Sequence, residues 1–151
     1  MTRKEPSETV SLIAISLIHT GIRLGTETSE RREFSYGFNA EITAPQRFDD
    51  ESFVFSAEYS ISKNSRESET EIAGFSARYY CAFESKYSSP AEAIEIALKF
   101  AETTIWSSFA SLSALATNQM GVGFPPLPPA PEHIGLKSPP DSPPREEPDT
   151  L

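Results

Sequence analysis

The chain has 151 residues, the length of one domain, and its ten Phe, five Tyr and one Trp supply enough large apolar side chains for a single core. Its 22 acidic and 13 basic side chains give a formal net charge of -9, which repels phosphate backbones and anionic lipid surfaces and excludes nucleic acid as a partner. The single cysteine, Cys81, leaves no internal disulfide, and the apolar run at 10–18 is far shorter than the ~20 residues that span a bilayer. We therefore expect a cytoplasmic protein without a segment inserted in a membrane.

The first expected element lies at 10–25, after nine polar residues, 1–9, that we expect to be disordered. Ile and Leu occur on both faces of this element, so periodicity alone does not separate a buried strand from a helix. A strand is favoured by the β-branched residues Val10, Ile13, Ile15, Ile18 and Ile22.

Three further segments, at 34–43, 52–62 and 73–84, alternate apolar and polar residues with the period of two that is typical of half-buried strands. Their apolar faces consist of Phe34, Tyr36, Phe38, Ala40 and Ile42; of Phe53, Phe55, Ala57, Tyr59 and Ile61; and of Ala73, Phe75, Ala77, Tyr79, Cys81 and Phe83. Short polar loops join the segments, so the four strands in series predict an antiparallel meander with one face in solvent.

The period then changes to that of a helix. Ser89, Pro90 and Glu92 predict an N-cap, a proline at the first helical position and a capping box. The apolar stripe that follows consists of Ile94, Leu98, Ala101, Ile105, Phe109, Leu112 and Ala116. Weak helix formers near 103–108 leave open one long helix or two helices with a kink near 102, and Gly121 ends the pattern.

Prolines dominate the C-terminal part of the chain, with ten of the 13 between Pro125 and Pro148. The segment 124–136 keeps apolar residues between its prolines, which predicts an extended loop lying on the domain. The acidic tail 137–151 has only Leu151 as a large apolar residue and is expected to be disordered. The expected fold is therefore α+β: a four-stranded antiparallel meander, a long or kinked helix, a proline-rich loop and a disordered tail, with residues 10–136 as the domain.

Catalytic chemistry finds little support in these residues. His19 and His133 lie far apart in the chain with only Cys81 as a soft ligand, so the ligand spacing of a zinc site is absent. Phosphate-binding loops and nucleophile-elbow motifs are absent as well. We expect a protein that is not an enzyme and that uses no cofactor and no metal.

The order of four antiparallel strands, a helix, a glycine stop and a proline-punctuated apolar loop resembles the SecB export chaperones and SecB-like proteins. The most specific segment is 100–131, FAETTIWSSFASLSALATNQMGVGFPPLPPAP. The positions that match the family pattern are Phe100, Trp106, Met120, Gly121, Pro125, Leu127 and Pro129. The chain departs from the pattern at Ser107, where the family usually has proline, and it lacks a counterpart of the second helix that closes SecB.

The resemblance implies a homotetramer, a dimer of dimers, that holds unfolded or nascent polypeptides for export or for one dedicated client of the antitoxin type. We expect client contacts near Trp106, Phe109, Leu112, Phe124 and Leu127, the alternative being that these five residues form plain core or an oligomer interface. In SecB an acidic sheet face docks the motor SecA, and here Glu41, Glu58 and Glu84 fall on the expected wet face. The rival hypothesis is an oligomeric scaffold or adaptor that recruits a partner through its proline-rich tail.

Overall fold

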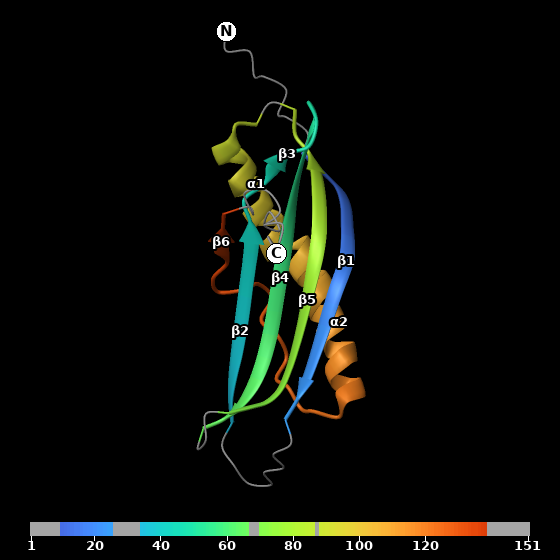
Figure 1. Cartoon of the computed structure of the whole chain (residues 1–151), viewed down its shortest axis with the longest axis vertical. Helices are drawn as coiled ribbons and strands as arrows, with labels where there is room; N and C mark the ends of the chain where they lie inside the picture. Colours follow the sequence, from blue (N-terminus) through green and yellow to red (C-terminus); the bar gives the residue numbers. More distant parts are fainter. Residues whose placement is uncertain (1–9, 26–33, 67–69, 87, 139–151) are drawn as a thin grey trace, which may run out of the picture.

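The computed structural model describes residues 10–25, 34–66, 70–86 and 88–138 (Figure 1). The segments 1–9 and 139–151, predicted to be disordered, lie outside the described residues. The elements are β1 (Ser11–Leu24), β2 (Phe34–Thr43), β3 (Gln46–Arg47), β4 (Ser52–Ser65), β5 (Glu71–Glu84), α1 (Pro90–Glu102), α2 (Thr104–Met120) and β6 (Gly135–Lys137). The strand predicted at 10–25 is therefore confirmed, and so is the α+β class.

The predicted four-stranded antiparallel meander is wrong in strand number and in strand order. Among the described residues the sheet has six strands, in the order β1-β5-β4-β2-β6, with the short β3 paired to β4. Strand β1 pairs with β5 and not with β2, and β6 is parallel to β2, so the sheet is mixed. Alternation identifies strands but not their neighbours, and pairing with β5 places the apolar residues of β1 beside aromatic ones, for example Leu12 opposite Phe83.

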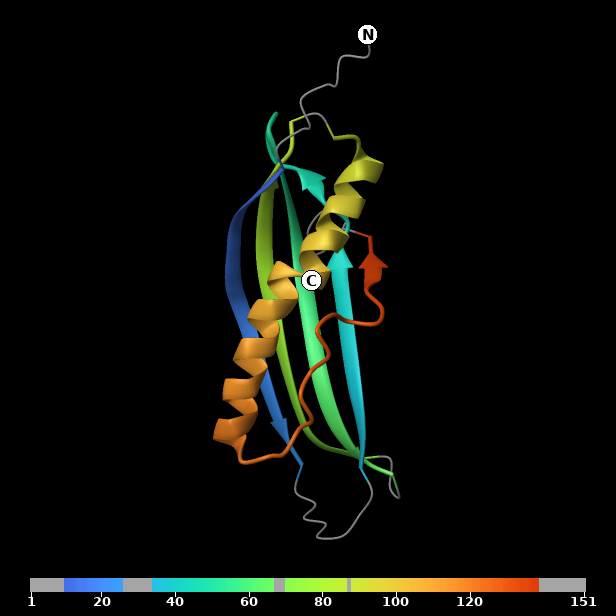
Figure 2. The same cartoon turned by 180° about the vertical axis from the view of Figure 1, so that it is seen from behind.

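The core lies between the sheet and the two helices, which cover one face (Figure 2). Every residue predicted for the apolar faces of β4 and β5 is buried. In β2 only Ala40 and Ile42 are buried, whereas Tyr36 and Phe38 remain 38% and 46% exposed. The end of β2 that carries these two rings is therefore incompletely covered.

Helix α1 begins as predicted, since the Ser89 side chain accepts from the Glu92 amide and the Glu92 side chain accepts from the Ser89 amide. Its buried stripe, however, consists of Ala93, Ala97 and Ala101, so the predicted Ile94 and Leu98 lie one position off and are only partly buried. Alanine side chains are small, so they let a helix approach a sheet closely. At this contact the sheet itself supplies the large rings. In α2 the predicted Ile105 and Phe109 are buried.

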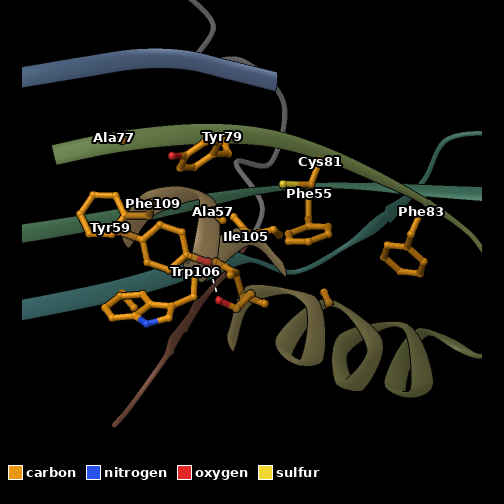
Figure 3. Packing of buried hydrophobic residues seen from close by; sticks show 14 of the residues in the cluster. Phe55, Ala57, Tyr59, Ala77, Tyr79, Cys81, Phe83, Ile105, Trp106 and Phe109 are labelled. Carbon is orange, nitrogen blue, oxygen red and sulfur yellow. Dashed lines mark hydrogen bonds between the residues drawn. The ribbon is translucent and has the colours of Figure 1, made fainter. Parts of the chain in front are cut away.

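A break at Thr103 separates the two helices, which confirms the kink left open by the sequence. The last carbonyls of a helix have no donor ahead in their own helix. Here the Thr103 hydroxyl donates to the Lys99 carbonyl at 2.7 Å, and the Thr103 amide donates to the Phe100 carbonyl at 3.3 Å. The buried Tyr59 hydroxyl donates to the Ala101 carbonyl at 2.6 Å, drawn as the dashed line in Figure 3. Strand β4 thereby holds the helix break in place.

Helix α2 ends at Gly121, whose φ of 70° is the left-handed conformation that favours glycine. The chain then turns back along the helix-covered side of the sheet as an extended loop, 122–134, and enters β6 beside β2 (Figure 2). Sequence reasoning expected this loop but not the strand that follows it. Lys137, assigned above to the tail, is the last residue of β6.

Candidate functional site

The proline-rich loop is fixed to the domain by the indole of Trp106. Its Nε1 donates to the Pro128 carbonyl at 2.8 Å, and its ring packs against Tyr59 at 5.4 Å between centroids and against Phe109 at 5.7 Å. Figure 3 shows these three rings turned toward one another between the sheet and α2. The side chain is 2% exposed, so the loop position depends on a buried and rigid group.

The start of the loop has a second attachment, near the first residues of β2. Lys63 donates from its ammonium group to the Gly123 carbonyl at 3.2 Å, and the same nitrogen lies 4.3 Å from the centre of the Phe34 ring. The Phe124 ring packs on Tyr36 at 6.0 Å between centroids. The loop is thus held near 123–124, at Pro128 and again at β6.

Between the last two attachments the loop leaves a hollow of ≈ 340 Å³ beside β2. We call this the β2 hollow. Its lining consists of Tyr36, Phe38, Asn39, Ala40, Trp106, Pro128, Pro131, Glu132 and His133. Most of these residues are apolar or aromatic, with a few polar groups at the rim, which is the composition of a binding pocket for an apolar side chain.

The structure separates the five residues predicted to contact clients. Trp106 lines the β2 hollow, whereas Phe109 is fully buried in the core and Leu112 packs partly buried against it. Phe124 and Leu127 line a different hollow, of ≈ 480 Å³, between the loop and α2. The β2 hollow therefore brings together only one of the five.

Sequence reasoning missed Tyr36, Phe38 and His133 as members of a site. The first two were assigned to the buried face of a strand, because their alternation with polar residues is the same as that of Ala40 and Ile42. Alternation shows which face a residue occupies but not whether another layer covers that face. A usable signal was the loop composition, since prolines leave a loop little freedom to close over a neighbouring strand.

The three glutamates predicted to dock a partner lie on the opposite face of the sheet, and two of them are paired within the chain. Glu41 accepts from the Lys137 ammonium at 2.5 Å, and this bond raises the pKa of Lys137. Glu58 accepts from Nε and Nη2 of Arg78 at 2.8 and 2.7 Å. Glu84 is exposed at the end of β5. Docking through these residues stays a prediction, and two of the three charges are already balanced by a neighbour.

A polar hollow of ≈ 360 Å³ lies on this face of the sheet. It is surrounded by the two ion pairs, Glu41 with Lys137 and Glu58 with Arg78, and Tyr80 and Thr43 also line it. Within the described ranges, no group of three or more His, Cys, Asp or Glu side chains could hold a metal ion. In the same part of the chain, no helix is long and apolar enough to cross a membrane. The polar hollow has balanced charge and gives no direct indication of a ligand.

Comparison with solved structures identifies proteins of similar fold. The fold is similar to that of a SecB-like chaperone. One solved structure with this fold is a SecB-like chaperone of Mycobacterium tuberculosis in complex with a ChAD peptide from the HigA1 antitoxin. It matches with a TM-score of 0.56 and 16% identity, over 83% of this chain and 91% of that chain. No protein-family model matches the sequence, and no curated protein matches it significantly.

At 16% identity the likeness concerns the fold. It covers most of both chains and agrees with the SecB-like fold that the sequence resemblance implied.

Cys81 lies on the core face of β5, and burial raises the pKa of its thiol to about 12. In the unfolded chain the thiol has its ordinary pKa of about 8.5, so the folded state holds this proton more tightly. The resulting contribution to stability is present below that value and is lost as the pH rises toward 12. By pH 10 the loss is about 2 kcal/mol.

We predict that Cys81→Ala weakens this alkaline destabilisation. Urea unfolding at pH 8 and pH 10 measures the difference in unfolding free energy for each protein, so that the cost of the substitution itself cancels. The wild type should lose about 2 kcal/mol more than the variant between the two pH values. An equal loss in both proteins would show that the thiol titrates normally in the folded chain.

Proposed function

We propose that this protein is a holding chaperone that binds extended apolar segments of unfolded clients at the β2 hollow. The observation that carries the proposal is the pair of exposed rings, Tyr36 and Phe38, at a hollow bounded by the buried Trp106 and a proline-rich loop. Large exposed apolar groups beside a preformed hollow mark binding surfaces for other molecules. The similarity of the fold to a chaperone solved with a peptide supports the same reading.

The size of the exposed surface fits reversible holding. Covering the exposed parts of the two rings removes roughly 170 Å² of apolar area from water and contributes about 4 kcal/mol. The loss of translational and rotational freedom on association costs a similar free energy, so one hollow binds an apolar segment weakly and reversibly. No bond is made or broken in such a cycle, and release needs only refolding of the client or a competing partner.

Within chaperone function, we favour one dedicated client over general export. Export through SecA would use an acidic docking face, but Glu41 and Glu58 are each paired with a cation of the same chain. The neighbour in the fold comparison holds a peptide of an antitoxin. A client of the antitoxin type, presented as one short apolar segment, matches a single small hollow better than the long segments of many exported proteins do.

We also propose that the chain assembles with itself through β1. This strand is at one edge of the sheet, and it exposes five large apolar side chains: Ile13, Leu17, Ile18, Ile22 and Leu24, each between 47% and 59% exposed. A long apolar edge strand left open promotes aggregation, so a stable protein covers it. A second copy of β1 fits, because a twofold axis places the same strand on both sides of the contact.

The client site is tested with Phe38→Ser and the matched control Phe48→Ser. Both phenylalanines are exposed, at 46% and 71%, but Phe48 lies in the β3–β4 connection outside the lining of the β2 hollow. We expect Phe38→Ser to lose about 2 kcal/mol of client affinity, roughly thirtyfold, and to stop delaying aggregation of an unfolded model client diluted from denaturant. Phe48→Ser should behave as the wild type.

Equal activity of the two variants would place the client elsewhere. Truncation after Ser138, which leaves Lys137 and its bond to Glu41 in place, should preserve the delay of aggregation. Loss of activity on that truncation would favour instead the adaptor hypothesis, in which the tail recruits the partner.

Assembly is tested with Ile18→Lys, which places a charge on the proposed contact without opening the core, because Ile18 is 53% exposed. Light scattering after size exclusion should give an oligomer for the wild type and a smaller species for the variant. The control Leu115→Lys changes an equally exposed residue, at 60%, on α2. A monomeric wild type would exclude self-assembly through β1.

A further inference from the structure

One edge of β2 is only partly paired. Strand β4 covers one side of β2 over Phe34–Ile42, whereas β6 covers the other side only at Glu41, Ile42 and Thr43. In the described part of the chain, no strand pairs with the outer side of 34–40. These seven residues are long enough to pair with a typical strand of five or six residues.

The backbone groups on this open edge belong to the residues whose side chains line the β2 hollow. The Ala44 amide donates to the Lys137 carbonyl, so even-numbered residues of β2 direct their backbone groups toward the β6 side. Along a strand, successive residues direct their backbone N–H and C=O groups to alternate edges of the strand and their side chains to alternate faces of the sheet. Tyr36 and Phe38 therefore present their N–H and C=O groups to the open edge and their rings to the hollow.

We propose that the client segment binds as an added strand along this edge, in line with β6, with alternate side chains entering the β2 hollow. The proposal rests on the proposed function and specifies how that site holds its ligand. Main-chain hydrogen bonds to Tyr36 and Phe38 give affinity without regard to sequence, and the hollow selects a large apolar side chain at every second position.

The chain itself shows that this edge accepts an extended segment, because β6 already pairs with it directly beyond the open part, from Glu41 onward. A hollow of ≈ 340 Å³ has room for one or two large side chains and not for a folded domain. Glu41, on the other face of β2, is already paired with Lys137, so the preference for cationic side chains on that face of an added strand comes from the net charge of -9. The occupant is therefore an extended peptide that alternates apolar with basic residues.

The test uses a fluorescently labelled seven-residue peptide in which phenylalanines alternate with lysines, and two N-methylated forms of it. One form carries N-methyl groups on the phenylalanines and the other on the lysines. In an added strand only one of these sets directs its N–H groups to β2: the phenylalanines if the strand is antiparallel, the lysines if it is parallel, as β6 is. The full chain is titrated and binding is followed by fluorescence anisotropy.

We expect one form to bind at least about fivefold more weakly for each hydrogen bond lost, and the other to bind as the parent peptide does. Equal affinities of the two forms would overturn strand addition and leave the proposed function standing. A parent peptide that binds neither the full chain nor the chain truncated after Ser138 overturns both proposals. Binding that occurs only after truncation at Ser138 would show that the tail of the chain occupies the edge, which also overturns this one.

Amide hydrogen exchange tests the same strand pairing from the side of the protein, through the exchange rates of the β2 backbone amides. The amides of Tyr36 and Phe38 should exchange rapidly in the free protein and at least about fivefold more slowly with the parent peptide bound. The amides of Ser35 and Gly37 face β4 and serve as internal controls that stay slow in both states. Unchanged exchange at Tyr36 and Phe38 in the saturated complex would overturn the proposal.

Discussion

The indole of Trp106 joins the three parts of the molecule on which the candidate site depends. Its ring packs on Tyr59 of the central strand β4, it stands on the first turn of α2, and its N–H donates to the Pro128 carbonyl. Loss of this bond would leave a buried donor without its acceptor, at a cost of about 1–3 kcal/mol. The sheet, the helix and the loop are therefore held at one point, and the β2 hollow lies directly beside it.

The break between α1 and α2 allows the contact of Trp106 with the sheet. A continuous helix from Pro90 to Met120 would leave its whole length straight over the sheet, whereas the break at Thr103 lets each half pack separately. Tyr59 takes part in both arrangements, since its hydroxyl bonds the end of α1 and its ring stacks on Phe109 of α2 at 5.1 Å between centroids. Alanines carry the contact of α1 with the sheet, and large rings carry that of α2.

Local signals in the sequence predicted the elements well but not the relations between them. The capping box at Ser89 and the glycine stop at Gly121 depend only on neighbours in the chain, and both are confirmed. The alternation in β4 and β5 is confirmed because the helices bury one face of these central strands and leave the other face outside the core. Strand β1 gave no clear period, and the structure shows why: its register shifts between Leu12 and Ala14 and again between Leu17 and His19. Each irregularity leaves an extra residue, Ile13 and Ile18, and inverts the alternation that follows.

The candidate site was only partly predictable, for a related reason. Trp106 stood out as the single tryptophan in the most specific segment, and it lines the β2 hollow. Tyr36 and Phe38 have the same pattern as the buried Ala40 and Ile42, and they differ because the described helices and loop cover their end of β2 only in part. Strand β6 has three residues and follows a proline-rich loop, so no local signal revealed it. An open edge is a property of the assembled sheet, and the sequence of β2 alone does not contain it.

The most direct measurement of the central claim is covalent capture of a client by a photoreactive residue. Benzoylphenylalanine replaces Phe38 in one variant and Phe48 in the other, and each is irradiated with an unfolded model client before the products are mapped by mass spectrometry. Capture at position 38, on an extended apolar segment of the client and with little product at position 48, is the predicted result. Capture at position 48 alone, or equal capture at both positions, would contradict a client site beside Trp106.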